Sequence, residues 1–169
     1  RLLLTASEDG ELASWDVRSG AKTRALPIAT GLHAFALSAD GRTAAVGIER
    51  GIQLVDMRTG DARRATGGLA AGRPNRVLFS PDGETVVSTH QDGTVTLWDA
   101  ESASPRETLR GHWNTAQQPV FSPDGDTLYT VSHDGTAIAW DLTGRRGLAR
   151  QFRFTDDPKI SSQGFDGDN

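Results

Sequence analysis

The chain has 169 residues, with 18 Lys and Arg against 22 Asp and Glu, and so a net charge of −4. It contains no cysteine, which excludes disulfides and thiolate metal sites. Runs of like charge are short and no apolar run approaches the roughly 18–20 residues of a membrane span, so we expect no nucleic-acid partner, no membrane partner and a cytoplasmic location.

Short apolar runs bounded by Gly, Pro, Asp and Ser predict a succession of strands and tight turns. The clearest strands are expected, in chain order, at 2–6, 11–16, 23–26, 117–122, 127–132, 136–141 and near 149–154. Asp-Gly dipeptides between them predict hairpin turns, because glycine readily adopts a positive φ. No stretch carries a 3.6-residue apolar period, so we expect an all-β fold without a substantial helix.

One pattern recurs along the chain: Ser or His, any residue, Asp-Gly, five residues and Asp. It ends at Asp16, Asp99 and Asp141, and a degenerate copy ends at Asp56, so the steps are 40, 43 and 42 residues. A second signature, SADG or SPDG, recurs every 42 residues. A period of roughly 40–45 residues with a Trp-Asp dipeptide is typical of the four-stranded blade of a β-propeller.

The repeat divides the chain into about four consecutive blades. We expect a partial first blade at 1–30, complete blades at 31–71, 72–110 and 111–154, and a tail or inter-blade linker at 155–169. Closed propellers have about 4–8 blades, and an open array exposes blade faces. We favour a segment of a larger propeller, completed by further blades of the same chain. A ring closed by a second copy, and a small four-bladed ring that uses the tail, remain alternatives.

Several motifs keep their order and spacing three or four times over. The clearest copy contains Gly111-His112, a Ser-Pro-Asp-Gly turn, Ser132-His133-Asp134-Gly135 and Trp140-Asp141. Together they resemble the WD-repeat (WD40) β-propeller family over nearly the whole chain. The Trp-Asp pairs themselves are Trp15, Asp16, Trp98, Asp99, Trp140 and Asp141.

The resemblance implies a hydrogen-bonded tetrad in the last blade, formed by His112, Ser132 (or Thr130), Asp134 and Trp140. A buried indole N–H needs an acceptor, which a hydroxyl can supply while it also bonds the imidazole. We expect this tetrad to be structural, not catalytic, because the histidine is locked inside a blade.

The other copies depart from the tetrad pattern. The third repeat has Arg73 where the histidine is expected, so its tetrad is predicted to be incomplete. The first repeat supplies Ser7, Asp9 and Trp15. The second has lost its turn Asp and its Trp, and we expect its blade to be the least ordered and the last blade the best ordered.

Binding on such a scaffold is expected in loops at the rim. The resemblance places the hairpin turns and the blade-to-blade connections on one face, where partners dock. The candidate partner-binding residues on this face are Glu8, Arg73, Asn75, Gln91, Trp113, Asn114 and His133. Trp113 is the strongest candidate, because exposed Trp is enriched in interface hot spots; the alternative is that Trp113 packs over the blade edge.

No catalytic residue, metal or cofactor is expected. The four histidines are scattered; His90 and His133, at nearby turn positions in adjacent blades, are the pair that a surface metal contact would use. The leading hypothesis is a non-catalytic protein–protein interaction scaffold in a larger signalling or regulatory protein. The excess of Arg over Lys with abundant Ala and Gly indicates a bacterial source. A ligand sensor or enzyme that uses the central channel is the alternative, and the mostly apolar or neutral first strands disfavour it.

Overall fold

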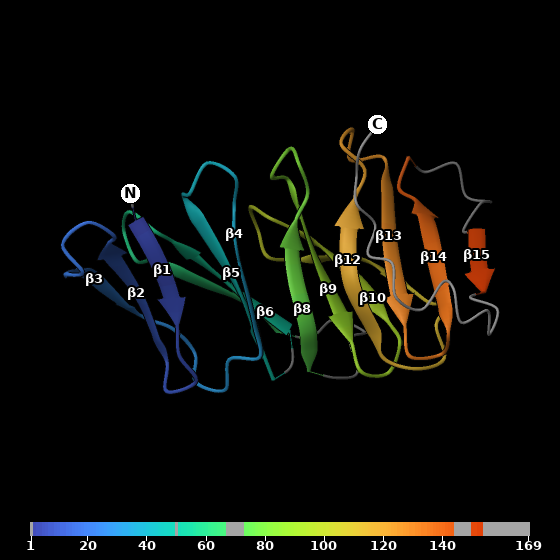
Figure 1. Ribbon diagram of the computed structural model, residues 1–169, viewed down its shortest axis with the longest axis horizontal. Coiled ribbons are helices and arrows are strands. Elements are labelled where there is room, and N and C mark those ends of the chain that lie inside the picture. Colours follow the sequence, from blue (N-terminus) through green and yellow to red (C-terminus); the bar gives the residue numbers. More distant parts are fainter. Residues whose placement is uncertain (1, 50, 67–72, 144–149, 154–169) are drawn as a thin grey trace.

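The computed structural model describes residues 2–49, 51–66, 73–143 and 150–153. These residues form fifteen strands, so the expected all-β class is confirmed (Figure 1). No helix of the described segments is long and apolar enough to cross a membrane.

The strands form four antiparallel sheets, which we number as blades one to four. Blade one contains β1 (Leu2–Ala6), β2 (Glu11–Asp16) and β3 (Lys22–Pro27). Blade two contains β4 (Ala34–Leu37), β5 (Thr43–Ile48), β6 (Gly51–Asp56) and β7 (Ala62–Thr66). Blade three contains β8 (Pro74–Phe79), β9 (Thr85–His90), β10 (Val95–Asp99) and β11 (Pro105–Leu109). Blade four contains β12 (Ala116–Phe121), β13 (Thr127–Ser132), β14 (Thr136–Asp141) and β15 (Arg150–Arg153). As predicted, the first blade has three strands and the others have four.

Within each blade, consecutive strands are neighbours, and the recurrent Ser-x-Asp-Gly segments turn the chain between the first two strands of blades two, three and four. In blade four the Ser122 hydroxyl donates to Asp124 at 2.5 Å and accepts from the Thr127 amide at 2.9 Å. Gly125 adopts φ +80° and donates its amide to the Ser122 carbonyl. These short-range bonds explain why the turn motif keeps its spacing.

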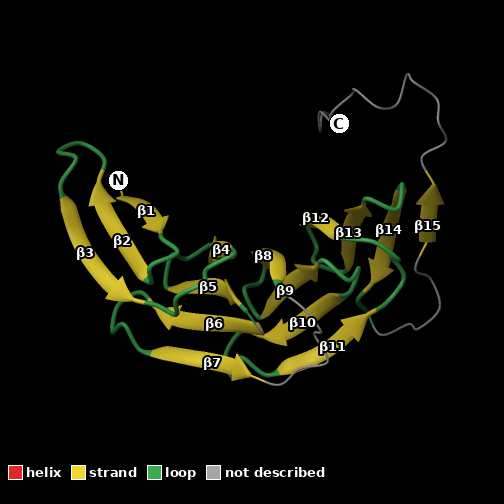
Figure 2. Ribbon diagram, turned by 90° about the horizontal axis from the view of Figure 1, so that it is seen from below, coloured by secondary structure: helices red, strands yellow, loops and turns green. Residues whose placement is uncertain are grey.

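The four blades follow one another in an open arc (Figure 2). The first strands β4, β8 and β12 lie along its concave edge, and β3, β7 and β11 lie along its convex edge (Figure 2). Blades one and four stand at opposite ends, and no ladder joins their sheets. The described residues therefore do not form the small four-bladed ring. The predicted tail, 155–169, lies outside them, and the predicted blade boundaries stay a prediction.

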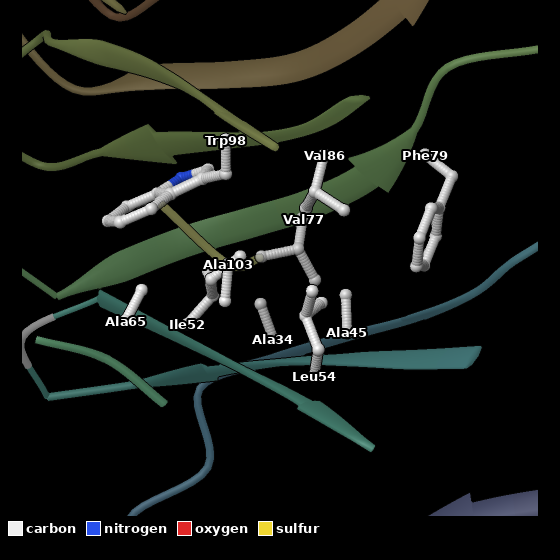
Figure 3. Packing of buried hydrophobic residues seen from close by; sticks show 10 residues of the cluster. All are labelled: Ala34, Ala45, Ile52, Leu54, Ala65, Val77, Phe79, Val86, Trp98 and Ala103. Atoms are coloured by element: carbon white, nitrogen blue, oxygen red, sulfur yellow. The ribbon is translucent and has the colours of Figure 1, made fainter. Parts of the chain in front are cut away.

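The hydrophobic core is divided among the three junctions between blades. Between blades two and three, Trp98 lies over Ile52 and Ala65 of the preceding blade (Figure 3). Similar clusters fill the junction of blades one and two and that of blades three and four. Each central blade thus buries both faces, and its second and third strands are buried at almost every position.

The two outer faces of the arc are exposed. Leu3 in blade one is 55% exposed, whereas its counterpart Leu128 in blade four is fully buried. Tyr129, on the other side of blade four, is 48% exposed, whereas its counterpart Val87 in blade three is fully buried. The residue types are those of a buried junction, but the described residues supply no neighbour there.

Candidate functional site

A chain of hydrogen bonds crosses the interior of blade four. The indole of Trp140 donates to the Thr130 hydroxyl at 2.9 Å, and that hydroxyl lies 2.8 Å from Nε2 of His112. Nδ1 of His112 lies 3.0 Å from the Thr136 hydroxyl and 3.3 Å from Asp134. Because Thr130 accepts from the indole and donates its own proton to Nε2, the arrangement fits a neutral imidazole with its proton on Nδ1.

The hydroxyl of this relay comes from Thr130, the alternative left open by the sequence, and the assignment to Ser132 was wrong. Trp140 pairs with Leu128 across the ladder, and Thr130 lies two residues further along the same sheet face. Ser132 is one more step away, and its hydroxyl donates to the Asn114 carbonyl at 3.0 Å. The indole therefore reaches the residue ten positions before it.

Burial and hydrogen bonding set the charge state of the pair. Burial lowers the pKa of His112 below its ordinary value, although the Asp134 carboxylate opposes this shift. Burial opposes ionisation of Asp134 as well, but hydrogen bonds from Thr136 and the Trp113 amide lower the pKa of Asp134 overall. A neutral histidine beside an ionised aspartate, both held by neighbours, has no exposed proton to transfer.

Blade three contains a relay of the same kind, which the sequence prediction did not anticipate. Trp98 donates to Ser88 at 2.8 Å, and the Ser88 hydroxyl lies 2.9 Å from Nε2 of His90. His90 is fully buried at the end of β9. The histidine therefore comes from the strand itself instead of the preceding loop, and Arg73 at the loop position does not leave the relay without an imidazole.

The burial of His90 also corrects the idea of a surface metal contact with His133. Among the described residues, no three His, Asp or Glu side chains come together as a possible metal site. His133 is exposed, and its Nε2 lies 2.8 Å from the Gln117 amide nitrogen.

Blade one follows the ten-residue spacing. Trp15 donates to the Thr5 hydroxyl at 2.9 Å. The predicted Ser7 instead bonds the Glu11 backbone within its own turn. In blades one, three and four, the relay hydroxyl therefore comes from the strand that pairs with the tryptophan strand on its inner side. It lies ten residues before the tryptophan, two residues before the position that the sequence predicted.

Blade two replaces the relay with apolar packing. Val46 and Val55 occupy the positions of the hydroxyl and the tryptophan, and both are fully buried. One buried polar contact remains, because the Gln53 side chain accepts the Ala29 amide at 2.7 Å across the junction with blade one. The turn residue Arg50 lies outside the described residues.

The aspartates that close the third strands organise turns. Asp16, Asp56 and Asp99 each accept backbone amides two and three residues ahead, and Asp141 accepts the amide of Thr143. The Ser102 amide and then Arg106 hold the pKa of Asp99 far below its usual range. These aspartates are structural.

The hairpin turns and blade connections of blades three and four meet on one face. Thr115 donates its hydroxyl to the Gln91 carbonyl at 3.2 Å, and Gln117 contacts His133. Side chains of Gln91, Asn114 and His133 are exposed there. We call the exposed residues Gln91, Trp113, Asn114 and His133 the Trp113 surface.

Trp113 is 74% exposed, the highest value among the large apolar side chains of the described residues. It therefore does not pack over the blade edge, which was the alternative. Its amide is fixed by the buried Asp134 carboxylate at 3.0 Å, so the relay of blade four also holds the loop that presents the indole.

The remaining predicted residues contribute less to this surface. Arg73 forms an exposed ion pair with Glu49 at 2.9 Å. Asn75 is half-buried and reaches the Ala116 carbonyl at 3.4 Å, a weak contact between blades three and four. Glu8 is exposed in blade one, far along the arc from Trp113.

The concave edge offers little for a channel ligand. Arg76 and Gln118 occupy equivalent positions on β8 and β12 and are exposed, and Gln118 has a positive φ of 42° at a bulge. On the same set of first strands, Leu37 of β4 and Val120 of β12 are exposed and apolar. The described strands bring no set of converging charged groups to this edge.

The four successive antiparallel sheets define a class of fold, an all-β array of propeller-type blades that is consistent with WD40 repeats. A family model described as "WD domain, G-beta repeat" matches residues 71–99 and 103–141, which belong to blades three and four.

The chain is also similar to the Protein LST8 homolog of Drosophila melanogaster, with 29% identity over 110 residues. The match covers 58% of this chain and 34% of that protein, so the chain spans about a third of the length of the curated relative it matches.

Proposed function

We propose that this chain is part of a larger WD40 propeller that acts as a non-catalytic scaffold and binds a protein or peptide through the Trp113 surface. WD repeats generally mediate protein–protein interactions. The observation that carries the proposal is the 74% exposure of Trp113 on a loop whose backbone is fixed from below.

The loop that carries Trp113 is held in place before any partner binds, because its backbone is bonded to Asp134. A large, amphipathic side chain on a fixed loop loses little conformational freedom when a partner covers it. The surrounding Gln91, Asn114 and His133 offer hydrogen bonds around the indole, the arrangement of an apolar centre and a polar rim.

The exposed end faces support a larger ring. Leu3 and Tyr129 belong to positions that are fully buried in the two central blades, which have a neighbour on each side. We infer that further blades of the same protein cover both faces; a second copy of the chain is the alternative occupant. We also propose that this larger protein is cytoplasmic and bacterial, for which the excess of Arg over Lys with abundant Ala and Gly is the support, and that it has a signalling or regulatory role.

Affinity capture with the full-length protein tests the scaffold proposal. We expect a bound protein that is retained by a Val17→Ala control, which removes another exposed apolar side chain, and weakened about 30-fold or more by Trp113→Ala, the effect of a hot spot worth ~2 kcal/mol. Equal capture by both variants with an unchanged fold would rule out the Trp113 surface.

A further inference from the structure

Arginines from the outermost strands fasten the first two junctions. Arg24 of β3 donates to the Met57 carbonyl of blade two at 2.8 Å. Arg63 of β7 donates to the Glu101 carbonyl of blade three. Both carbonyls follow a strand-closing aspartate, by one residue for Met57 and by two for Glu101. The two junctions thus share one device: the guanidinium of an arginine on the outermost strand donates a hydrogen bond to a backbone carbonyl just after the third strand of the next blade.

Among the residues that the structure describes, the third junction lacks this device. Arg24, Arg63 and Glu107 are equivalent, because they pair with Ser14, Leu54 and Leu97, each the residue before the Trp or Val position of its blade. Glu107 is a carboxylate and cannot donate to a carbonyl.

The receiving end of the third junction is nevertheless built in the same way. The Leu142 amide bonds the Asp126 carbonyl at 2.9 Å, as the Met57 amide bonds Arg42 and the Ala100 amide bonds Glu84. The carbonyls of Leu142 and Thr143 therefore stand where the other junctions accept an arginine.

A cavity marks the place. Between blades two and three, Arg63, Leu54 and Ala100 line a compartment of about 90 Å³, beside a separate one of about 630 Å³. The counterparts Glu107, Leu97 and Leu142 line a cavity of about 350 Å³ between blades three and four.

The charge of this cavity is negative. Its carboxylates belong to Asp82, Glu107, Asp124 and Asp126. Its guanidinium, from Arg106, is already bonded to Asp99 at 2.5 Å and to the Thr85 hydroxyl at 3.0 Å. Because Arg106 is bonded elsewhere, the carboxylates of the cavity are available to a cation from outside the described residues.

We propose that the cavity between blades three and four is a second docking site, which takes an arginine side chain of a protein partner in place of the arginine that the fold supplies at the other two junctions. The planar guanidinium pairs with the Glu107 carboxylate and donates to the Leu142 or Thr143 carbonyl. The site rests on the proposed scaffold function only in that its partner is a protein, and it lies apart from the Trp113 surface.

Ligand-observed NMR on the full-length protein tests the site with N-acetyl-arginine amide as the probe. The uncharged, isosteric citrulline amide and the lysine amide are the matched controls. We expect saturation transfer to the arginine amide, and a Kd raised about tenfold or more by Glu107→Gln, since hydrogen bonds to charged groups are among the strong ones. Glu107→Arg, which fills the cavity from within, should abolish the transfer and keep or raise the melting temperature. Glu84→Arg, an equal charge change outside the cavity, should retain it.

Equal transfer to the citrulline or lysine amide, or an unchanged Kd in Glu107→Gln, would overturn the site. Neither result would touch the scaffold proposal, which depends on Trp113→Ala. Conversely, unchanged partner capture by Trp113→Ala would leave the arginine site standing on its own measurement.

Discussion

His90 and His112 make the same contact in neighbouring blades from different elements. Nε2 of each lies 2.8–2.9 Å from a hydroxyl that accepts a tryptophan N–H, but His90 ends a strand and His112 lies in a connection between blades. The requirement is for an imidazole at that point in space, and two positions in the repeat can supply it.

The relay hydroxyl of blade three should be a strong determinant of stability. Ser88→Ala leaves the Trp98 N–H and Nε2 of His90 without this partner in a fully buried setting, so we expect a loss of about 1–3 kcal/mol in the free energy of unfolding. Thr5→Ala, at the exposed relay of blade one, is the control and should cost less. Denaturant titration of both variants measures the difference; equal losses would contradict the account.

The protein should lose stability in mild acid through His112. Its pKa is lowered in the folded state, so the unfolded chain takes up a proton first, and stability declines as the pH falls below the ordinary histidine pKa of about 6.5. The pKa of Asp134 is also lowered in the folded state, so Asp134 stabilises the fold above its ordinary pKa of 3.8, and this stabilisation is lost as the pH falls below that value. The stability losses due to His112 and to Asp134 therefore occur in separate pH ranges.

The measurement is the melting temperature between pH 7 and pH 5. His112→Gln lowers stability at all pH values but should flatten the slope. The same slope in His112→Gln as in the parent would refute this role of His112.

Gln53 should tie blade one to blade two. Gln53→Leu keeps a similar volume but removes the acceptor of the buried Ala29 amide, with an expected cost of about 1–3 kcal/mol. Hydrogen exchange should show faster exchange at Ala29 and in β3. Gln91→Leu, on an exposed turn, is the control, and unchanged protection at Ala29 would show that the contact is dispensable.

Gly93 should be intolerant of any side chain. It has φ +83°, and a Cβ there would meet the His112 carbonyl oxygen at 2.5 Å. Gly135, with φ +78° and open space around it, is its counterpart in blade four. We expect Gly135→Ala to cost about 1–2 kcal/mol from backbone strain, and Gly93→Ala to cost a further ~1–3 kcal/mol from the clash. Equal unfolding midpoints for the two variants would contradict the close packing of this turn on the next blade.

The repeat period and turn chemistry were readable because they are local. Ser-x-Asp-Gly turns and strand-closing aspartates bond residues a few positions away, so their spacing in the sequence is their geometry. The tetrad required three-dimensional reasoning: Ser132 precedes the turn aspartate as expected of a tetrad member, but the indole of Trp140 reaches Thr130 because of the pairing register.

Residues that fill the same role from different positions of the repeat could not be identified from one sequence. His90 looked like a turn residue, because a strand-borne histidine has no local signature that separates it from a surface one. The arginines at the junctions are recognisable only after strand pairing shows that Arg24 and Arg63 are equivalent to Glu107. Whether blade two is the softest remains a prediction, although Val46 and Val55 are completely buried.

The central claim is that neighbouring blades cover the two ends of the arc while the Trp113 surface stays open for a partner. Hydroxyl-radical footprinting of the full-length protein without partner compares Trp113, Trp15 and Tyr129 in one experiment. The account predicts fast oxidation of Trp113 and slow oxidation of Trp15 and Tyr129. Oxidation of Trp15 and Tyr129 as fast as that of Trp113, or protection of Trp113 in the free protein, would contradict it.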